Sequence, residues 1–170
     1  MAIKQRFKTN FWFDKEAEEA AKFYVSVFKN SKINRITRYG KEGHEIHKMP
    51  AGSVMTVEFT LDGQTFAALN GGPLFKFNES ISTIVNCESQ NEIDYYWEKL
   101  SAGADKKSQQ CGWLKDKFGV SWQIVPTMLS DLFADHESKQ YASVMRAMLQ
   151  MKKLDINKLE EAARKEAVEA

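Results

Sequence analysis

The sequence contains little of several features that would place a protein in a class directly. It has two cysteines among 170 residues, no run of like charge, and no apolar stretch near the ~20 residues that span a bilayer. Its 24 basic residues balance 23 acidic ones, which leaves neither a nucleic-acid footprint nor a membrane-surface patch. The N-terminal residues carry no apolar signal core. We therefore expect a cytoplasmic protein with no nucleic acid and no membrane among its partners.

The two cysteines, Cys87 and Cys111, both lie in stretches that alternate like β-strands. Such positions favour buried, reduced thiols over a disulfide framework. With 43% hydrophobic and 28% charged residues, the chain can bury an ordinary core but is too short for two large independent domains. We expect one compact body with an appendage, and a partner that is small and uncharged or mixed in charge.

The most informative stretch is Cys111 to Pro126, with the sequence CGWLKDKFGVSWQIVP. Asp116 to Gly119 is a turn signal, and the aromatic and β-branched residues after it alternate up to the closing proline, which cannot donate a further ladder hydrogen bond. Leu61 to Leu69 has the same hairpin pattern, with Gly63 in the place of Gly119 (119 − 63 = 56). The chain therefore contains one structural unit twice.

The first unit reads as β-α-β-β-β. In order, the predicted elements are a strand over Thr9 to Phe13, a helix over Lys15 to Phe28 capped by Asp14, a strand over Ser31 to Tyr39, a polar loop over Lys41 to Gly52, and a hairpin of Ser53 to Leu61 with Gln64 to Leu69. The loop contains His44 and His47, which we interpret as solvated because the loop lacks a helix that would bring both rings to one metal.

The second unit is shorter. Its predicted elements are a strand over Ser82 to Cys87, a helix over Glu92 to Leu100 capped by Glu88 or Ser89, a polar loop over Ala102 to Gln110, and the hairpin of Cys111 to Val125. Placing Asp14 on Glu88 needs an offset of 88 − 14 = 74, so 74 − 56 = 18 residues are extra in the first unit, which Ser31 to Gly52 accommodates.

After Pro126 only helical periodicity remains. Helices are predicted in Met128 to Phe133, Lys139 to Met151 and Asn157 to Val168. Val144, Met148 and Met151 form an apolar stripe that needs a surface to cover.

Four stretches of the sequence resemble the vicinal-oxygen-chelate superfamily of glyoxalases, extradiol dioxygenases and bleomycin-resistance proteins, and within it the PhnB-like, demethylubiquinone methyltransferase-like branch. They are WFDKEAEEAAKFY (Trp12 to Tyr24), LDGQTFAALNGG (Leu61 to Gly72), the hairpin from Cys111 to Pro126, and MKKLDINKLEEA (Met151 to Ala162). The resemblance implies an α+β fold. In it, two βαβββ units, residues 6–72 and 79–126, form an open β cup within one domain, 1–126, and a helical extension, 127–170, follows.

The resemblance also identifies four positions where members of the superfamily hold a metal, typically with His, Gln or Glu. In this sequence they are Thr9, Ala67, Ser82 and Gln123. A transition metal requires imidazole, thiolate or carboxylate ligands, and none of the four residues supplies one. We therefore expect a cup without metal and without another cofactor.

The same positions lead to a predicted ligand-binding set. If Thr9 and Gln123 face the cup, alternation places Phe11 and Phe13 there too and turns Trp12 and Trp122 toward the helices. The predicted ligand-binding residues are Thr9, Phe11, Ser82, Cys111, Trp113 and Gln123. Glu58 lies on an alternating strand and is a candidate catalytic base, with a solvated sheet face as the alternative. Cys111 borders the cup but has no adjacent histidine or positive charge to activate it.

Three function classes follow from this pattern. The preferred one is a PhnB-like glyoxalase-fold protein that binds a small organic molecule in a metal-free cup, or a cofactorless enzyme. A metal-dependent lyase or dioxygenase follows from the superfamily but conflicts with the four ligand positions. A methyltransferase follows only from the label of the branch, because no helix is predicted after Asn70-Gly71-Gly72-Pro73.

We also expect a homodimer. An open cup leaves sheet edges exposed, and proteins pair or cover such edges. The superfamily that the chain resembles often does so by dimerising. The apolar stripe of the tail could dock on its own cup or on that of a partner.

Overall fold

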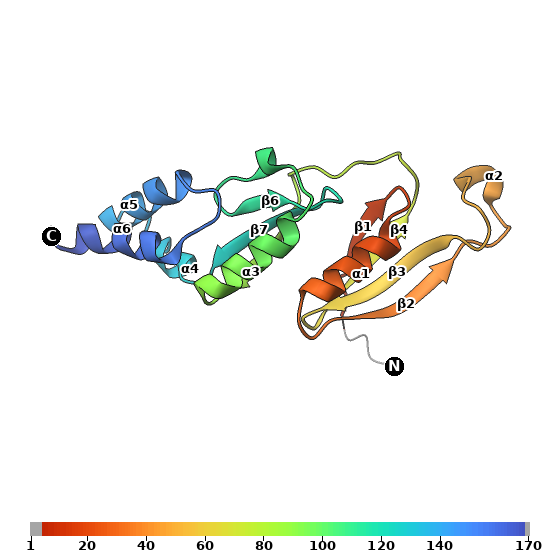
Figure 1. Ribbon diagram of the computed structural model, residues 1–170, viewed down its shortest axis with the longest axis horizontal. Coiled ribbons are helices and arrows are strands. Elements are labelled where there is room, and N and C mark those ends of the chain that lie inside the picture. The colour runs from red at the N-terminus through yellow and green to blue at the C-terminus, as the bar shows by residue number, and fades with distance from the viewer. Residues whose placement is uncertain (1–4, 169–170) are drawn as a thin grey trace. The chain divides into compact units, whose positions relative to one another are not determined.

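The computed structural model describes residues 5–168, which form two compact units divided between Phe77 and Asn78 (Figure 1). Each unit contains one open sheet with a long helix on one face, and the second unit continues into helices. The α+β fold with paired units and a helical C-terminal part is thus confirmed. Every helix that the structure describes is too short or too polar to span a bilayer.

The first unit holds a four-stranded sheet in the order β1-β4-β3-β2, in which β1 runs parallel to β4 and the other neighbours are antiparallel. Its elements are β1 (Thr9–Phe13), α1 (Ala17–Val27), β2 (Lys32–Arg38), α2 (His44–His47), β3 (Val54–Leu61) and β4 (Gln64–Asn70). The expected polar loop contains the one-turn helix α2, whose residues are not buried.

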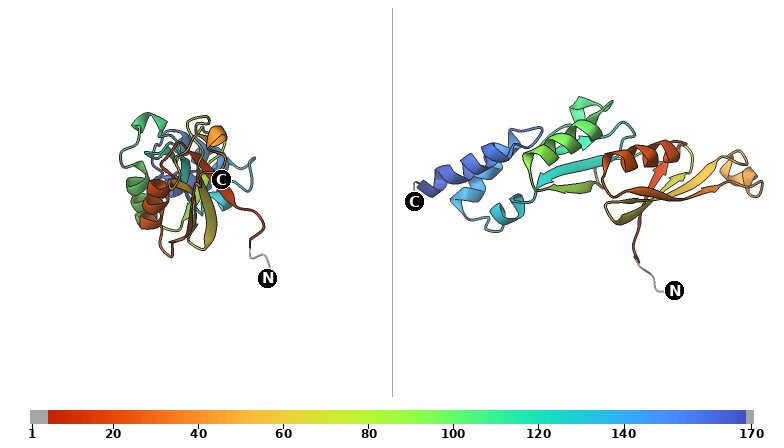
Figure 2. Two further views of the ribbon diagram at one scale, coloured as in Figure 1. Left: turned by 90° about the vertical axis from the view of Figure 1, so that its right-hand side faces the viewer. Right: turned by 60° about the horizontal axis from the view of Figure 1, so that its bottom comes forward.

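The core of the first unit lies between its sheet and α1. Phe11, Phe59 and Phe66 stack on this face, with ring centroids 5.7–5.8 Å apart along the row, and Tyr24 of α1 stacks on Phe59 at 6.1 Å. The views in Figure 2 show α1 and α3 each running along the sheet of its own unit.

Asn70 connects α1 to this sheet. Its side chain is 4% exposed, its Oδ1 accepts a hydrogen bond from Ala17 N at 2.8 Å, and its Nδ2 donates to Val54 O at 3.0 Å. The expected cap, Asp14, does not cap the helix, because α1 begins three residues later and Asn70 satisfies its first N–H group.

The second unit holds a three-stranded sheet in the order β5-β7-β6, with β5 parallel and β6 antiparallel to β7. Its elements are β5 (Thr83–Cys87), α3 (Gln90–Ser101), the 3-10 helix η1 (Lys106–Ser108), β6 (Trp113–Lys115), β7 (Ser121–Pro126), α4 (Leu129–Leu132), α5 (Lys139–Leu149) and α6 (Ile156–Val168). Ser89 caps α3 as expected, since its side chain accepts from Glu92 N.

The second unit differs from the repeat in one element, because it has three described strands where the first unit has four. The segment before β6 forms η1 and turns in the place of a further strand. These turns cover the edge of β6: Gln110 exchanges two backbone hydrogen bonds with Trp113, and Ser108 Oγ accepts from Lys115 N at 3.2 Å. An edge protected in this way offers few backbone groups for pairing with another chain.

The hairpin turn between β6 and β7 is built on Asp116, as its sequence predicts. This buried carboxylate accepts hydrogen bonds from Phe118 N, Val120 N and Trp122 Nε1, at 2.8–3.0 Å. Three donors compensate for the burial of one charge and hold the turn to the strand that follows it.

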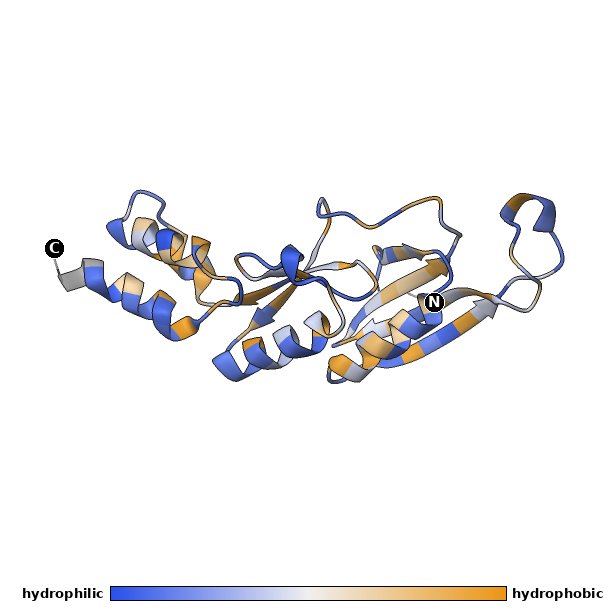
Figure 3. Cartoon of the chain, turned by 45° about the horizontal axis from the view of Figure 1, so that its top comes forward, coloured by the Kyte–Doolittle hydropathy of each residue, from blue (hydrophilic) through white to orange (hydrophobic). Residues whose placement is uncertain are grey.

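The C-terminal helices pack on the second unit of their own chain, which answers the question that the sequence left open. Their core consists of Leu129, Val144, Leu154, Leu159 and Ala163, with Met148 and Met151 packed against it. Helices α5 and α6 carry both hydrophobic and hydrophilic positions (Figure 3), as an amphipathic pair requires. The apolar stripe is therefore covered within the subunit.

Candidate functional site

Within the second unit, one face of the sheet packs against α3, and we call the opposite face, which carries partly accessible side chains, the open face. Leu114, Trp122 and Ile124 are buried on the face packed against α3. Because neighbouring residues of a strand point to opposite faces, Trp113 and Gln123 lie on the open face, where β6 and β7 pair them directly. Trp122 thus lies on the helix-covered face, as expected, and Gln123 lies on the opposite face.

Three of the predicted ligand-binding residues come together on this open face. Gln123 is paired with Trp113 across the strands, and its Nε2 donates to Ser82 Oγ at 2.7 Å. The group combines an indole, an amide and a hydroxyl, all of them partly accessible.

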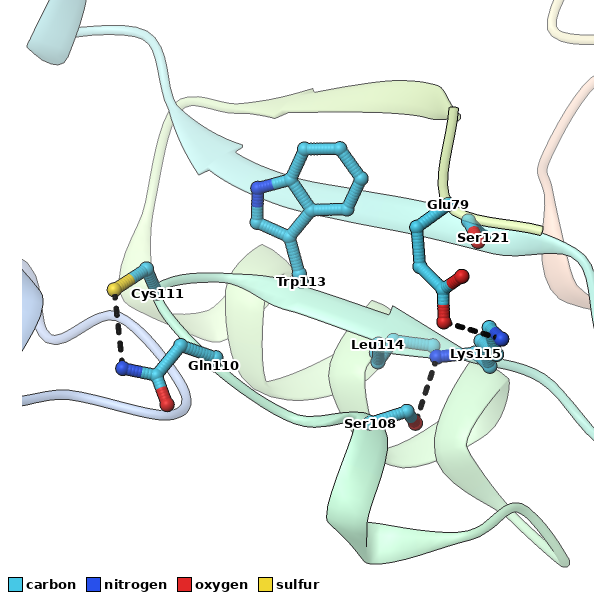
Figure 4. Close-up of a pocket in the computed structure, with 8 residues that line it drawn as sticks. All are labelled: Glu79, Ser108, Gln110, Cys111, Trp113, Leu114, Lys115 and Ser121. Carbon is cyan, nitrogen blue, oxygen red and sulfur yellow. Dashed lines mark hydrogen bonds and ion pairs between the residues drawn. The ribbon is translucent and has the colours of Figure 1, made fainter. Parts of the chain in front are cut away.

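A pocket of about 410 Å³ lies along β6 and includes two predicted residues, Trp113 and Cys111. Figure 4 shows the Trp113 indole and the Glu79–Lys115 ion pair beside one another along this strand. The lining residues are Glu79, Ser108, Gln110, Cys111, Trp113, Leu114, Lys115 and Ser121. Lys115 is not among the predicted residues, although alternation from Trp113 places it on the same face. It also missed Glu79, for which the sequence contains no signal.

Cys111 occupies a turn before β6 and not the strand itself, which corrects the expected position. Its φ is +49° and that of Gly112 is +82°. A Cβ at Gly112 would lie 2.9 Å from Ile124 O and 3.1 Å from Leu154 Cδ1, so only glycine fits there. The backbone N–H groups of Cys111 and Gly112 donate to Met151 O and Lys152 O at 2.9 and 2.7 Å. The segment between α5 and α6 therefore holds this end of the pocket.

The three predicted site residues of the first unit are arranged differently from the expectation. Phe11 is 6% exposed and stacks on Phe66 beneath α1, so it belongs to the core. Thr9 is exposed at the start of β1. Ala67 pairs with Asn10 and not with Thr9, so Thr9 and Ala67 point to opposite faces of the sheet. The face assigned to the side chains of β1 was therefore wrong by one residue. Trp12, expected beneath the helix, is on the opposite face.

Glu58 lies on the face of the first sheet that faces away from α1, where β3 places it between Arg35 of β2 and Ala67 of β4. Its carboxylate forms an ion pair with Lys8, and both side chains are more than a third exposed. This is the geometry of a solvated ion pair. A catalytic role for Glu58, and a cavity joining residues of the two units, remain predictions.

The donor set does not fit a transition metal. Ala67 has no donor atom, Ser82 and Gln123 are neutral and hydrogen-bonded to each other, and Thr9 is a lone hydroxyl. In residues 5–168, no three His, Cys, Asp or Glu side chains gather closely enough to hold a metal ion.

The glycine pair after β4 does not fit a nucleotide-type cofactor either. A Cβ at Gly71 would lie 2.2 Å from the Trp12 ring, and Trp12 Nε1 donates to Gly72 O at 2.9 Å. The glycines thus make room for an indole. The chain beyond them forms no helix before β5, so there is no helix N-terminus to hold a phosphate or a carboxylate.

Comparison with known proteins identifies similar chains. A family model described as 3-demethylubiquinone-9 3-methyltransferase matches residues 5–125. The PhnB protein from Bacillus cereus is 35% identical, with a TM-score of 0.61, over 72% of this chain and 100% of its own. No curated protein matches the chain.

Fold similarity extends to the fosfomycin resistance protein FosX from Listeria monocytogenes. One FosX structure is 13% identical, with a TM-score of 0.54, over 79% of this chain and 100% of its own. A FosX mutant complexed with Mn(II) and 1S,2S-dihydroxypropylphosphonic acid is 14% identical, with a TM-score of 0.50, over 72% of this chain and 92% of its own.

Proposed function

Because the chain belongs to the 3-demethylubiquinone-9 3-methyltransferase family, a PhnB-like branch of the glyoxalase fold, we propose that it binds a small organic molecule on the open face of its second sheet. The observation that carries the proposal is the pocket of about 410 Å³ beside Trp113. Small-molecule sites typically combine an apolar wall with a few polar groups that orient the ligand. Trp113 supplies the wall, and Gln110, Lys115 and Ser121 supply polar groups.

Binding without a resident metal follows from the donor set. FosX, of the same fold, has been crystallised with both a metal and a small phosphonate. That complex supports the capacity of the fold to hold small molecules. Its metal is not carried over to this chain, because the four positions at which the family resemblance places metal ligands, Thr9, Ala67, Ser82 and Gln123, supply no anionic or imidazole ligand. The methyl-transfer activity in the family description has no support from the glycine pair at Gly71, which Trp12 fills.

A thermal-shift screen of metabolites, with and without divalent ions, tests this function. A ligand at 100 times its dissociation constant should stabilise the protein by ~2.7 kcal/mol. The shift should be lost in Trp113→Ala and kept in Trp97→Ala, the same substitution in α3. A shift that persists in Trp113→Ala, or that requires added metal, would show that the proposal is wrong.

A further inference from the structure

The pocket beside Trp113 contains one cation and one anion. Lys115 of β6 pairs with Glu79, which lies in a turn before β5. Among the described residues that line the pocket, no other is charged. The two side chains differ in exposure, 28% for Lys115 and 65% for Glu79. The ammonium group is therefore the more enclosed partner, and the carboxylate reaches it from the solvent side.

Glu79 is a replaceable partner for this cation. An ion pair exposed on one side contributes little to stability, because solvent screens it and holding two long side chains together costs entropy. The Lys115 ammonium lowers the pKa of Glu79, so the carboxylate is charged when it occupies this position. A ligand carboxylate could take its place without leaving Lys115 unpaired. Glu79 would then move into water, where a charged group is well solvated.

The Trp113 indole and the Lys115 ammonium group lie side by side on one strand. Trp113 and Lys115 are two residues apart on β6, which separates their Cα atoms by about 6.6 Å and points both side chains to one face. A flat ring can stack on the indole while an acidic group attached to that ring reaches the ammonium. Once Glu79 has moved away, the pocket has a single positive charge, which matches a monoanion better than a dianion.

We propose that this pocket takes an aromatic carboxylate, whose ring stacks on Trp113 and whose carboxylate displaces Glu79 from Lys115. The inference rests on the proposed function and adds the chemical class of the ligand. It also gives Glu79 a role, as an internal competitor that occupies the cation when the pocket is empty.

Isothermal titration with benzoate, 2-naphthoate, benzyl alcohol and phenyl phosphate tests the inference on the full chain. The two carboxylates should bind more tightly than the neutral alcohol and the dianion. Lys115→Met should weaken carboxylate binding by about ten-fold or more and leave benzyl alcohol unchanged. Glu79→Gln should tighten carboxylate binding by about two- to five-fold, since the competitor is removed.

Two exposed residues outside the pocket provide matched controls, Lys107→Gln in η1 and Glu98→Gln in α3, and neither should change binding. Equal affinity for benzoate and benzyl alcohol, or no tightening in Glu79→Gln, would overturn the inference. If none of the four probes binds while the metabolite screen still yields a ligand that depends on Trp113, this inference is wrong and the proposed function stands. If benzoate and the ligands found in the metabolite screen all bind Trp113→Ala unchanged, both are wrong.

Discussion

At the scale of single residues, the two cysteines have opposite environments. Cys87 is fully buried at the end of β5, and burial raises the pKa of its thiol to about 12, with a smaller contribution from the Glu92 carboxylate. Cys111 is partly exposed in the turn that borders the pocket, where Gln110 Nε2 lies 3.7 Å from its Sγ. The Cys87 thiol packs in the core as a small apolar group, and the Cys111 thiol is accessible to reagents.

The raised pKa of Cys87 links stability to alkaline pH. The thiol pKa of a cysteine in an unfolded chain is about 8.5. The unfolded chain therefore releases this proton at a lower pH than the folded chain does. The stabilisation from burying the neutral thiol is therefore complete below about pH 8.5 and is lost as the pH rises toward 12.

Alkylation should separate the two thiols. Iodoacetamide at pH 8 should modify Cys111 of the native protein and leave Cys87 intact, because only the accessible thiol reaches the reagent. Mass spectrometry of peptides gives the sites. As a control, Cys111→Ser should take up no label when native and one label in urea. Labelling of native Cys87 at the rate of the unfolded chain would contradict the burial described here.

At the scale of elements, Gln90 joins α3 to the C-terminal helices. Its Oε1 accepts from Ile156 N, the first N–H of α6, at 2.9 Å, and its Nε2 donates to Leu154 O at 3.2 Å. Lys153 adds an ion pair with Asp94 of α3 at 2.5 Å. One carboxamide thus satisfies the carbonyl of Leu154 and the N–H group of Ile156. The side chain of Leu154 is buried in the core of the C-terminal helices.

Gln90→Ala should loosen α6. Removing two hydrogen bonds to this segment should lower the free energy of unfolding by about 1–3 kcal/mol. Hydrogen exchange should accelerate in residues 151–165, and the first sheet should keep its protection because it makes no use of Gln90. Gln64→Ala, an exposed glutamine at the start of β4, is the matched control. Unchanged exchange in α6 would mean that the apolar core alone holds the helix.

At the scale of the whole molecule, the state of association remains a prediction. The edge of β6 is covered by Gln110 and Ser108, so pairing through that edge is not favoured. Ile84 of β5 lies on the open face of the second sheet and is 54% exposed, and Ile81 before it is 75% exposed. These apolar side chains are candidates for burial by a second copy of the chain.

Light scattering at micromolar protein should give twice the 19.5 kDa of one chain. A stable two-fold dimer needs on the order of 1,600 Å² of buried surface. Ile84→Lys should shift the population toward the monomer, because it places a charge on the open face. Lys32→Glu, at an exposed position of β2, should not change the population. A mass near that of one chain for the unchanged protein would reject the dimer.

Features that depend on local pattern could be predicted from the sequence: the two units, the hairpin turn on Asp116, the faces of β7, and the helical C-terminal part. Periodicity and turn chemistry act over a few residues, and they can be read without knowing the distant contacts. The family relationship added the positions at which a metal site would lie.

Which distant side chains and backbone groups meet became clear only from the packing of the elements. Asn70 caps α1 from 53 residues away, Glu79 reaches Lys115 from the turn before β5, and the segment at Met151 holds Cys111 from 40 residues beyond it (151 − 111 = 40). The face to which each side chain of β1 points also depends on strand pairing, because a one-residue change of register reverses every side chain. The pairing of Asn10 with Ala67 specifies that register. Contacts between distant residues depend on how the elements pack, and no local pattern in the sequence encodes them.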